Sequence, residues 1–168
     1  MELPQDTLYD ILIYFSIDDI IKLNKRIKNL QVLQDHLFWI KKIMHDFHTE
    51  ILVNTDNYTF SDWIRLYRIY DRVKKQITLI KHISHYQMIL KDVEFNHIIQ
   101  YLPENIATDK LTSNANVNAN VNILYKWVSN QYKITIWGPS NIGINVKITP
   151  ESLFTLLFYI YYFYPKIR

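Results

Sequence analysis

The chain has only two glycines and no cysteine among its 168 residues. Average usage would place about a dozen glycines in a chain of this length, at roughly 7%. So few glycines exclude the glycine-rich phosphate loops of dinucleotide-binding and P-loop folds. The missing cysteine excludes disulfide frameworks, thiol nucleophiles, iron–sulfur clusters and cysteine zinc sites. No enzyme signature stands out in what remains, so we expect neither catalysis nor a cofactor.

The rest of the composition is that of a globular protein, with 49% hydrophobic and 21% charged residues. Isoleucine, asparagine, lysine and tyrosine, which have AT-rich codons, supply 67 of the 168 residues, and we interpret this bias as that of an AT-rich genome. The net charge of +3 is too mild to indicate nucleic acid as a partner. The longest apolar run, Leu153 to Tyr164, is well short of the ~20 residues of a membrane span. No signal peptide is visible, and we expect a cytoplasmic protein.

The first 50 residues predict short, closely spaced helices, because apolar residues recur every three or four positions. Ser16 with Asp19 three residues later resembles a capping box at the start of the second helix. A longer helix is predicted over about residues 62–83, with Thr59 or Ser61 as its cap. One stripe of this helix is apolar, and the opposite stripe is basic. The basic stripe consists of Arg65, Arg68, Arg72 and Lys75.

The second half of the chain predicts one more helix, near residues 86–102, followed by an asparagine-rich stretch. Residues 112–122 read TSNANVNANVN, which cannot bury apolar surface and is typical of a linker. Two alternating segments, 132–137 and 142–148, flank a turn and predict a β-hairpin that contains both glycines. Thr149 and Pro150 then predict the start of a buried helix that runs to about Tyr162.

The titratable residues do not form a recognisable chemical site. Two histidine pairs, His45 with His48 and His82 with His85, have a spacing that could place two ligands on one helix face. No carboxylate stands in a fixed relation to either pair, and partly exposed helix histidines are the simpler interpretation. We therefore predict no metal site and no catalytic residue.

The N-terminal segment carries the most specific pattern, LPQDTLYDILIYFSIDDIIKL. This segment resembles the start of an F-box, and Asp35, Phe38 and Trp39 resemble its end. Asn24 to Ile27 is similar to the central N-K-R-F of F-box-like proteins of large DNA viruses, and Trp63 to Tyr67 is similar to the W-x-x-L-Y that often follows. The resemblance covers about residues 2–70, and no leucine-rich, WD or kelch repeat follows it.

The resemblance implies an adaptor that docks on the Skp adaptor of a cullin-RING ubiquitin ligase and presents a target protein, in the cytoplasm of the host cell if the chain is viral. A three-helix F-box is too small to bury its whole apolar face alone, and in this family the Skp adaptor completes it. The residues that the resemblance assigns to this contact are Leu3, Pro4, Leu8, Ile11, Leu12, Phe15, Ile20, Ile21, Leu23, Ile27, Phe38 and Trp39. The candidate target-binding residues are Trp127, Tyr132, Trp137 and Asn141.

The sequence as a whole predicts a mainly α fold with a minor β part. We expect an F-box-like domain at 1–48, a helical extension at 49–111, a linker at 112–122 and a small hairpin-plus-helix region at 123–168. Two other functions stay open. The basic stripe of the long helix could track phosphates of a nucleic acid, although we do not expect nucleic acid as the partner. The apolar N-terminal residues could instead form an internal core, in a structural protein with an F-box-like fold.

Overall fold

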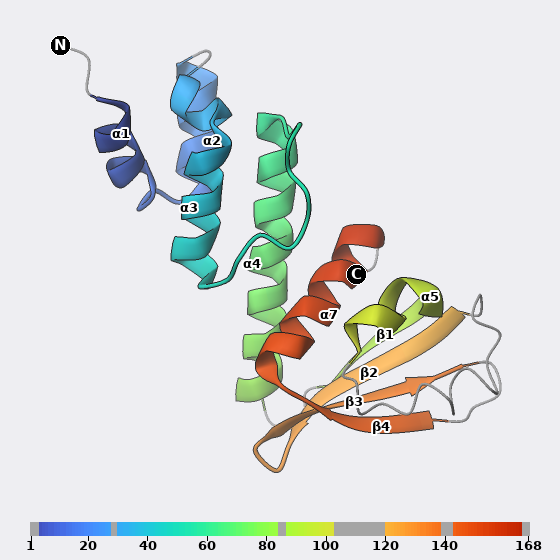
Figure 1. Ribbon diagram of the computed structural model, residues 1–168. Coiled ribbons are helices and arrows are strands. Elements are labelled where there is room, and N and C mark those ends of the chain that lie inside the picture. Colours follow the sequence, from blue (N-terminus) through green and yellow to red (C-terminus); the bar gives the residue numbers. More distant parts are fainter. Residues whose placement is uncertain (1–3, 28–29, 84–86, 103–119, 139–142, 166–168) are drawn as a thin grey trace. The chain divides into compact units, whose positions relative to one another are not determined.

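The computed structural model describes residues 4–27, 30–83, 87–102, 120–138 and 143–165 (Figure 1). The chain divides into two compact units, residues 1–71 and 72–168. The boundary falls inside the longest helix, α4 (Phe60–His82), so each unit contains part of α4.

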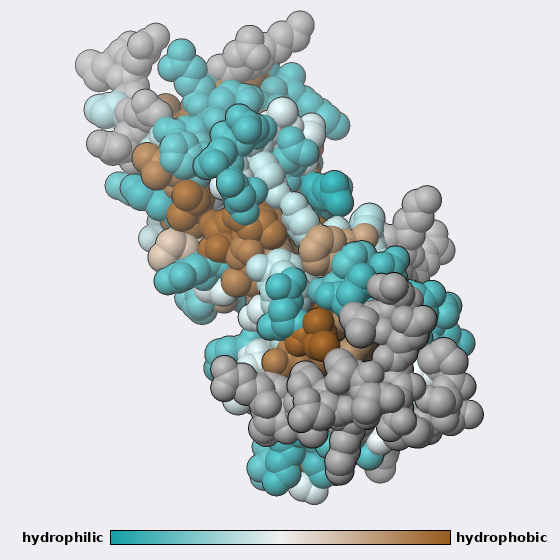
Figure 2. All heavy atoms as spheres, turned by 45° about the vertical axis from the view of Figure 1, so that its right-hand side comes forward, coloured by the Kyte–Doolittle hydropathy of each residue, from teal (hydrophilic) through white to brown (hydrophobic). Residues whose placement is uncertain are grey.

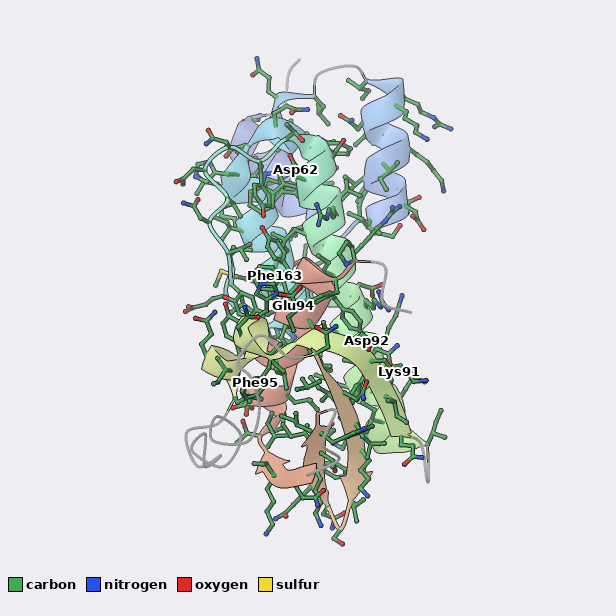
Figure 3. The ribbon with its side chains drawn as sticks, turned by 90° about the vertical axis from the view of Figure 1, so that its right-hand side faces the viewer. Asp62, Lys91, Asp92, Glu94, Phe95 and Phe163 are labelled. Carbon is green, nitrogen blue, oxygen red and sulfur yellow. The ribbon has the colours of Figure 1, made fainter. Side chains whose placement is uncertain are left out.

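Short helices form the first unit. These are α1 (Gln5–Leu12), α2 (Ile17–Arg26), the 3-10 turn η1 (Gln31–Gln34), α3 (His36–Phe47) and the first half of α4. Polar side chains cap α2, α3 and α4. Ser16 caps α2 as predicted, because its Oγ accepts a hydrogen bond from the Asp19 amide at 3.2 Å. Thr59 and Asp62 cap α4 reciprocally, since Thr59 N donates to the Asp62 carboxylate at 3.0 Å and Asp62 N donates to Thr59 Oγ1. Asp62 is labelled at this start of α4 in Figure 3.

The second unit is built on a four-stranded antiparallel sheet with the order β1-β2-β3-β4. Its strands are β1 (Gln87–Glu94), β2 (Asn120–Val128), β3 (Gln131–Trp137) and β4 (Gly143–Ile148). A short helix α5 (Phe95–Ile98) and the 3-10 turn η2 (Ile99–Tyr101) follow β1, and α7 (Pro150–Phe163) follows β4. The prediction of a mainly α fold with a minor β part is therefore wrong: in the described segments, the sheet is a substantial part of the structure.

One face of the sheet is buried, and α7 packs on it. Tyr125, Ile134 and Ile136 point to this face and are fully buried. Tyr161 of α7 reaches the same face, with its hydroxyl 3.5 Å from that of Tyr125. α7 begins as predicted, because Thr149 Oγ1 accepts from the Ser152 amide at 3.1 Å and Pro150 occupies the first turn.

The end of α7 is attached to the end of β1. The hydroxyl of Tyr164 accepts a hydrogen bond from the backbone amide of Glu94 at 3.0 Å and lies 2.8 Å from Nδ1 of His97. The ring of Phe163 stacks on His97, with centroids 5.2 Å apart. Figure 3 labels Glu94 and Phe95 at the point where β1 leads into α5, and Phe163 on α7. Polar and aromatic contacts thus fix the closing helix to the edge strand.

The predicted helix over residues 86–102 is wrong in its first half, where residues 87–94 form β1; only the short turns α5 and η2 that follow are helical. A bulge explains the misleading pattern. The register with β2 shifts between Leu90 and Val93, and Asp92 has a left-handed backbone with φ 57°. The bulge directs both Leu90 and Val93 inward although they are three residues apart, and both are fully buried. A spacing of three on one face is the helical signal, so the bulged strand imitates a helix in sequence.

The predicted hairpin is present but is only half of the sheet. β3 and β4 pair from Trp137 opposite Gly143 to Tyr132 opposite Ile148. The predicted linker overlaps β2 at residues 120–122, where Val121 is buried, whereas residues 112–119 lie outside the described segments. The asparagines of this stretch obscured the alternating apolar pattern that marks the start of β2.

A two-residue turn joins β2 to β3 without any glycine. Ser129 and Asn130 both have positive φ, 53° and 58°, and Val128 pairs with Gln131 across the turn. Two left-handed residues between paired strands are typical of a type I′ turn, whose twist matches that of the strands.

We predict that Ser129→Val lowers the free energy of unfolding by about 1–2 kcal/mol, because a β-branched residue is strained at positive φ. Ser129→Asn should leave stability unchanged or raise it, since asparagine tolerates this conformation. Thermal unfolding of both variants checks the prediction. Equal melting temperatures for the two variants would show that the turn does not depend on this backbone conformation.

Candidate docking surface of the N-terminal unit

The structure places the predicted docking residues in two different environments. Four of them lie in the core of the N-terminal unit: Leu12, Ile20, Phe38 and Trp39. Three are half-buried: Leu8, Ile21 and Leu23. Four are exposed: Pro4, Ile11, Phe15 and Ile27. Leu3 lies outside the described residues. The unit therefore uses part of this apolar set for its own core.

Trp39 of α3 is the central side chain of this core. Its indole ring is fully buried and stacks on Trp63 of α4, with centroids 6.1 Å apart and an interplanar angle of 7°. The indole Nε1 donates to the carbonyl oxygen of Leu33 at 2.9 Å, so its polar group is satisfied inside the core. Phe38 meets the same ring edge-on at 5.2 Å. These contacts join η1, α3 and the start of α4.

A buried hydroxyl ties α1 to the start of α3. Tyr9 is almost fully buried, and its hydroxyl donates to the carboxylate of Asp35. The other oxygen of Asp35 accepts from the Leu37 amide at 2.9 Å and caps α3. The hydrogen bond from Tyr9 holds the pKa of Asp35 below its usual value. This hydrogen bond fixes the middle of α1 to the start of α3.

Apolar side chains at the end of α1 and after α2 are exposed. Ile11, Tyr14 and Phe15, at the end of α1, expose 44%, 76% and 38% of their surfaces, and Ile27 after α2 exposes 48%. We call Ile11, Tyr14, Phe15 and Ile27 the exposed apolar group. Figure 2 shows apolar residues, in brown, that reach the surface among hydrophilic ones. Tyr14 was not among the predicted contacts, although it follows Ile11 at the helical spacing of three residues and lies between two predicted contacts in sequence.

A buried lysine, Lys42 of α3, forms a charged cluster with neighbouring side chains of the N-terminal unit. Lys42 exposes only 2% of its side chain, and its ammonium donates to the carbonyl of Ile13 at 2.8 Å and to Asp46 at 2.6 Å. Tyr67 of α4 donates to the same carboxylate oxygen at 2.6 Å, and His45 Nδ1 lies 2.7 Å from the other oxygen. The cluster therefore joins the loop after α1 to α3 and α4.

The pKa values of Asp46 and Tyr67 in this cluster are shifted in opposite directions. Burial alone would raise the pKa of Asp46, but the hydrogen bonds from Lys42, Tyr67 and His45 outweigh it, and the pKa lies below its usual value. Burial raises the pKa of the Tyr67 hydroxyl, and its hydrogen bond to Asp46 raises it further. At neutral pH the cluster is thus an ion pair with a protonated tyrosine, which suits a structural role.

The basic stripe of α4 is divided between the two units. Arg65 and Arg68 are exposed in the first unit. In the second unit Lys75 is exposed, whereas Arg72 is half-buried, with its guanidinium 3.8 Å from the centroid of the Tyr161 ring. Arg72 therefore contributes a cation–π contact to the packing of α7.

The predicted target-binding residues lie on opposite faces of the sheet. Trp127 and Tyr132 are cross-strand neighbours on the face that α7 covers, with ring centroids 4.5 Å apart, and burial raises the pKa of Tyr132. Trp137 points to the other face and is half-buried. Asn141 lies outside the described residues. The structure thus does not bring these residues together as one surface.

The comparisons add no relative: no protein-family model, no curated protein and no solved structure matches the chain. Within the described segments, no helix combines the length and apolar character that crossing a membrane requires. In the same segments, no three or more histidine and carboxylate side chains come together as a metal-binding group.

The Asp46 cluster predicts how stability depends on pH. Because folding lowers the pKa of Asp46, its contribution is present above the unfolded pKa of about 4 and is lost as the pH falls through the lower folded value. Asp46→Asn should therefore be less stable than the unmutated chain at pH 7, by about 2 kcal/mol, because Lys42 keeps its charge without a full partner. Chemical denaturation at several pH values below 7 checks this.

The stability difference between the two proteins should shrink as the pH is lowered below 4. Lys42→Met removes the buried charge and keeps a side chain of similar length. It should therefore lower the free energy of unfolding less than Asp46→Asn does. A difference that stays constant down to pH 2 would contradict the ion-pair assignment.

Proposed function

We propose that the N-terminal unit docks on the Skp adaptor of a cullin-RING ubiquitin ligase, and that the second unit presents a protein target. In this proposal the ligase transfers ubiquitin, and the chain contributes no catalytic residue. The F-box resemblance and the AT-rich composition together support a viral protein that modulates ubiquitination in the host cytoplasm. The role of this chain would be to bring two other proteins together.

The exposed apolar group is the observation that carries the proposal. Ile11, Tyr14, Phe15 and Ile27 lie within the segment that resembles an F-box, yet they are not used by the core of the unit. Exposed apolar side chains favour protein–protein contact, because burying them on binding removes apolar area from water. Tyrosine adds a hydroxyl that tolerates both water and a buried interface, which makes Tyr14 suited to such a contact.

The buried members of the predicted set have a supporting role in this proposal. Ile20, Phe38 and Trp39 are closed into the core, so they would position the surface and would not touch the partner. Among the residues that the resemblance assigns to docking, we therefore propose that the exposed and half-buried ones make the contact. Truncating a core member should unfold the unit, and truncating an exposed one should weaken binding only.

The test is binding of the purified Skp adaptor to the full chain, measured by isothermal titration calorimetry. Ile11→Glu with Phe15→Glu should weaken binding by at least about tenfold, because two charges would enter an apolar contact. The matched control is Leu79→Glu with Ile83→Glu. Leu79 of α4 and Ile83 directly after it have nearly the same exposed fractions, 39% and 46%, as Phe15 and Ile11, and they lie in the other unit.

The circular dichroism spectra of both double variants should match that of the unmutated protein, since all four residues are exposed. Failure of the unmutated protein to bind the Skp adaptor would overturn the proposal. An equal loss of binding in the control variant would show that the exposed apolar group is not the docking site.

A further inference from the structure

Three lysines form a row across strands β2, β3 and β4. The register pairs Lys126 with Lys133, and Lys133 with Lys147. Residues directly opposite each other in antiparallel strands project from the same face, and neighbouring strands lie about 4.8 Å apart. The three side chains therefore form one stripe perpendicular to the strands, which we call the lysine row.

The lysine row lies on the face of the sheet that α7 does not cover. In β3, Ile134 and Tyr132 on either side of Lys133 are buried and point to the α7 face, so Lys133 points to the other face. The same alternation applies to Lys126, which lies beside the buried Tyr125. Lys126 and Lys133 are partly covered, and Lys147 is exposed. The charged ends of all three can thus reach solvent.

Among the described residues, no carboxylate forms an ion pair with this row. Residues 110–150 contain no aspartate or glutamate, although they contain four lysines. In the described part of the sheet, the acids in the strands are Asp92 and Glu94 at the end of β1: the Asp92 amide donates to Asn122, and Glu94 pairs with Asn120. Asn122 and Asn120 are four and six residues from Lys126 on β2, or about 13 and 20 Å. Like charges directly opposite each other destabilise a sheet, so a bound anion would relieve the repulsion and stabilise the fold.

The rest of this face indicates which anion fits. The next stripe contains Ile89, Leu124, Thr135 and Asn145, which pair in register from β1 to β4. Apolar, hydroxyl and amide groups next to cations are suited to the mixed side chains and backbone of a protein segment. Surfaces that bind single-stranded nucleic acid instead stack successive bases on several aromatic rings. Among the described residues of this face, Trp137 is the one aromatic side chain.

We propose that the lysine row binds an acidic, extended segment of a protein target. The proposal deepens the proposed function, on which it rests for the existence of a target, and it assigns the chemistry of that target. The carboxylates of the segment would pair with the three ammonium groups, and its other side chains would contact the adjacent stripe. The N-terminal unit takes no part in this contact, so the two proposals can fail separately.

The test is fluorescence anisotropy with a labelled 12-residue peptide of alternating glutamate and serine, added to the full chain. Binding should weaken with added salt, because exposed charges are screened. Lys126→Gln, Lys133→Gln and Lys147→Gln together should weaken it about tenfold, since each exposed ion pair contributes a factor of about two. The matched control, Lys22→Gln with Lys25→Gln and Lys41→Gln, removes the same charge from exposed lysines of the first unit and should change binding less than twofold.

Three further measurements decide the outcome. The same peptide with glutamine in place of glutamate should not bind, and the Ile11→Glu/Phe15→Glu variant should bind the acidic peptide normally. The melting temperature of the lysine-row variant should not fall, since like charges are removed. Absence of binding to the acidic peptide, or an equal loss in both triple-lysine variants, would overturn the proposal. Tighter binding of a 12-nucleotide oligo-dT than of the peptide would overturn it in favour of a nucleic-acid surface.

Discussion

The stacked pair of Trp39 and Trp63 is the contact on which the N-terminal unit depends. The two rings lie nearly parallel, both are buried, and the hydrogen bond from Trp39 to Leu33 fixes the orientation of one of them. Since this pair joins α3 to α4, it completes a core that α1 and α2 alone could not close. The apolar side chains Ile11 and Phe15 at the end of α1, and Ile27 after α2, lie outside this core.

The same constraint separates two roles that the sequence pattern presents as one. Trp39 and Ile11 both belong to the apolar set that resembles an F-box, yet one is fully buried and the other is 44% exposed. A periodic apolar pattern predicts which side chains are buried from water, but not whether they are buried within their own chain or against a partner. The distinction becomes visible only in the packing of the unit. In our proposal, the exposed residues contact the partner.

Local signals predicted local structure well. Ser16 and Thr149 cap the helices that the sequence assigned to them, and Thr59, one of two candidates, caps α4, because capping depends on a few adjacent residues. The strands β1 and β2 could not be predicted in the same way. In β1 the bulge at Asp92 gave Leu90 and Val93 a helical spacing, and in β2 the asparagines masked the alternation around Val121. The lysine row depends on the register of three strands, although the stretch free of carboxylates was already visible in the sequence.

The most direct test of the account is hydrogen exchange of the full chain with and without the purified Skp adaptor. Backbone amides are protected where a partner excludes water and holds the helices closed. We expect added protection at residues 8–27, which include the exposed apolar group, and no change in β2, β3 and β4. Protection confined to the sheet, or no change anywhere at saturating adaptor, would contradict the central claim that this surface is the docking site.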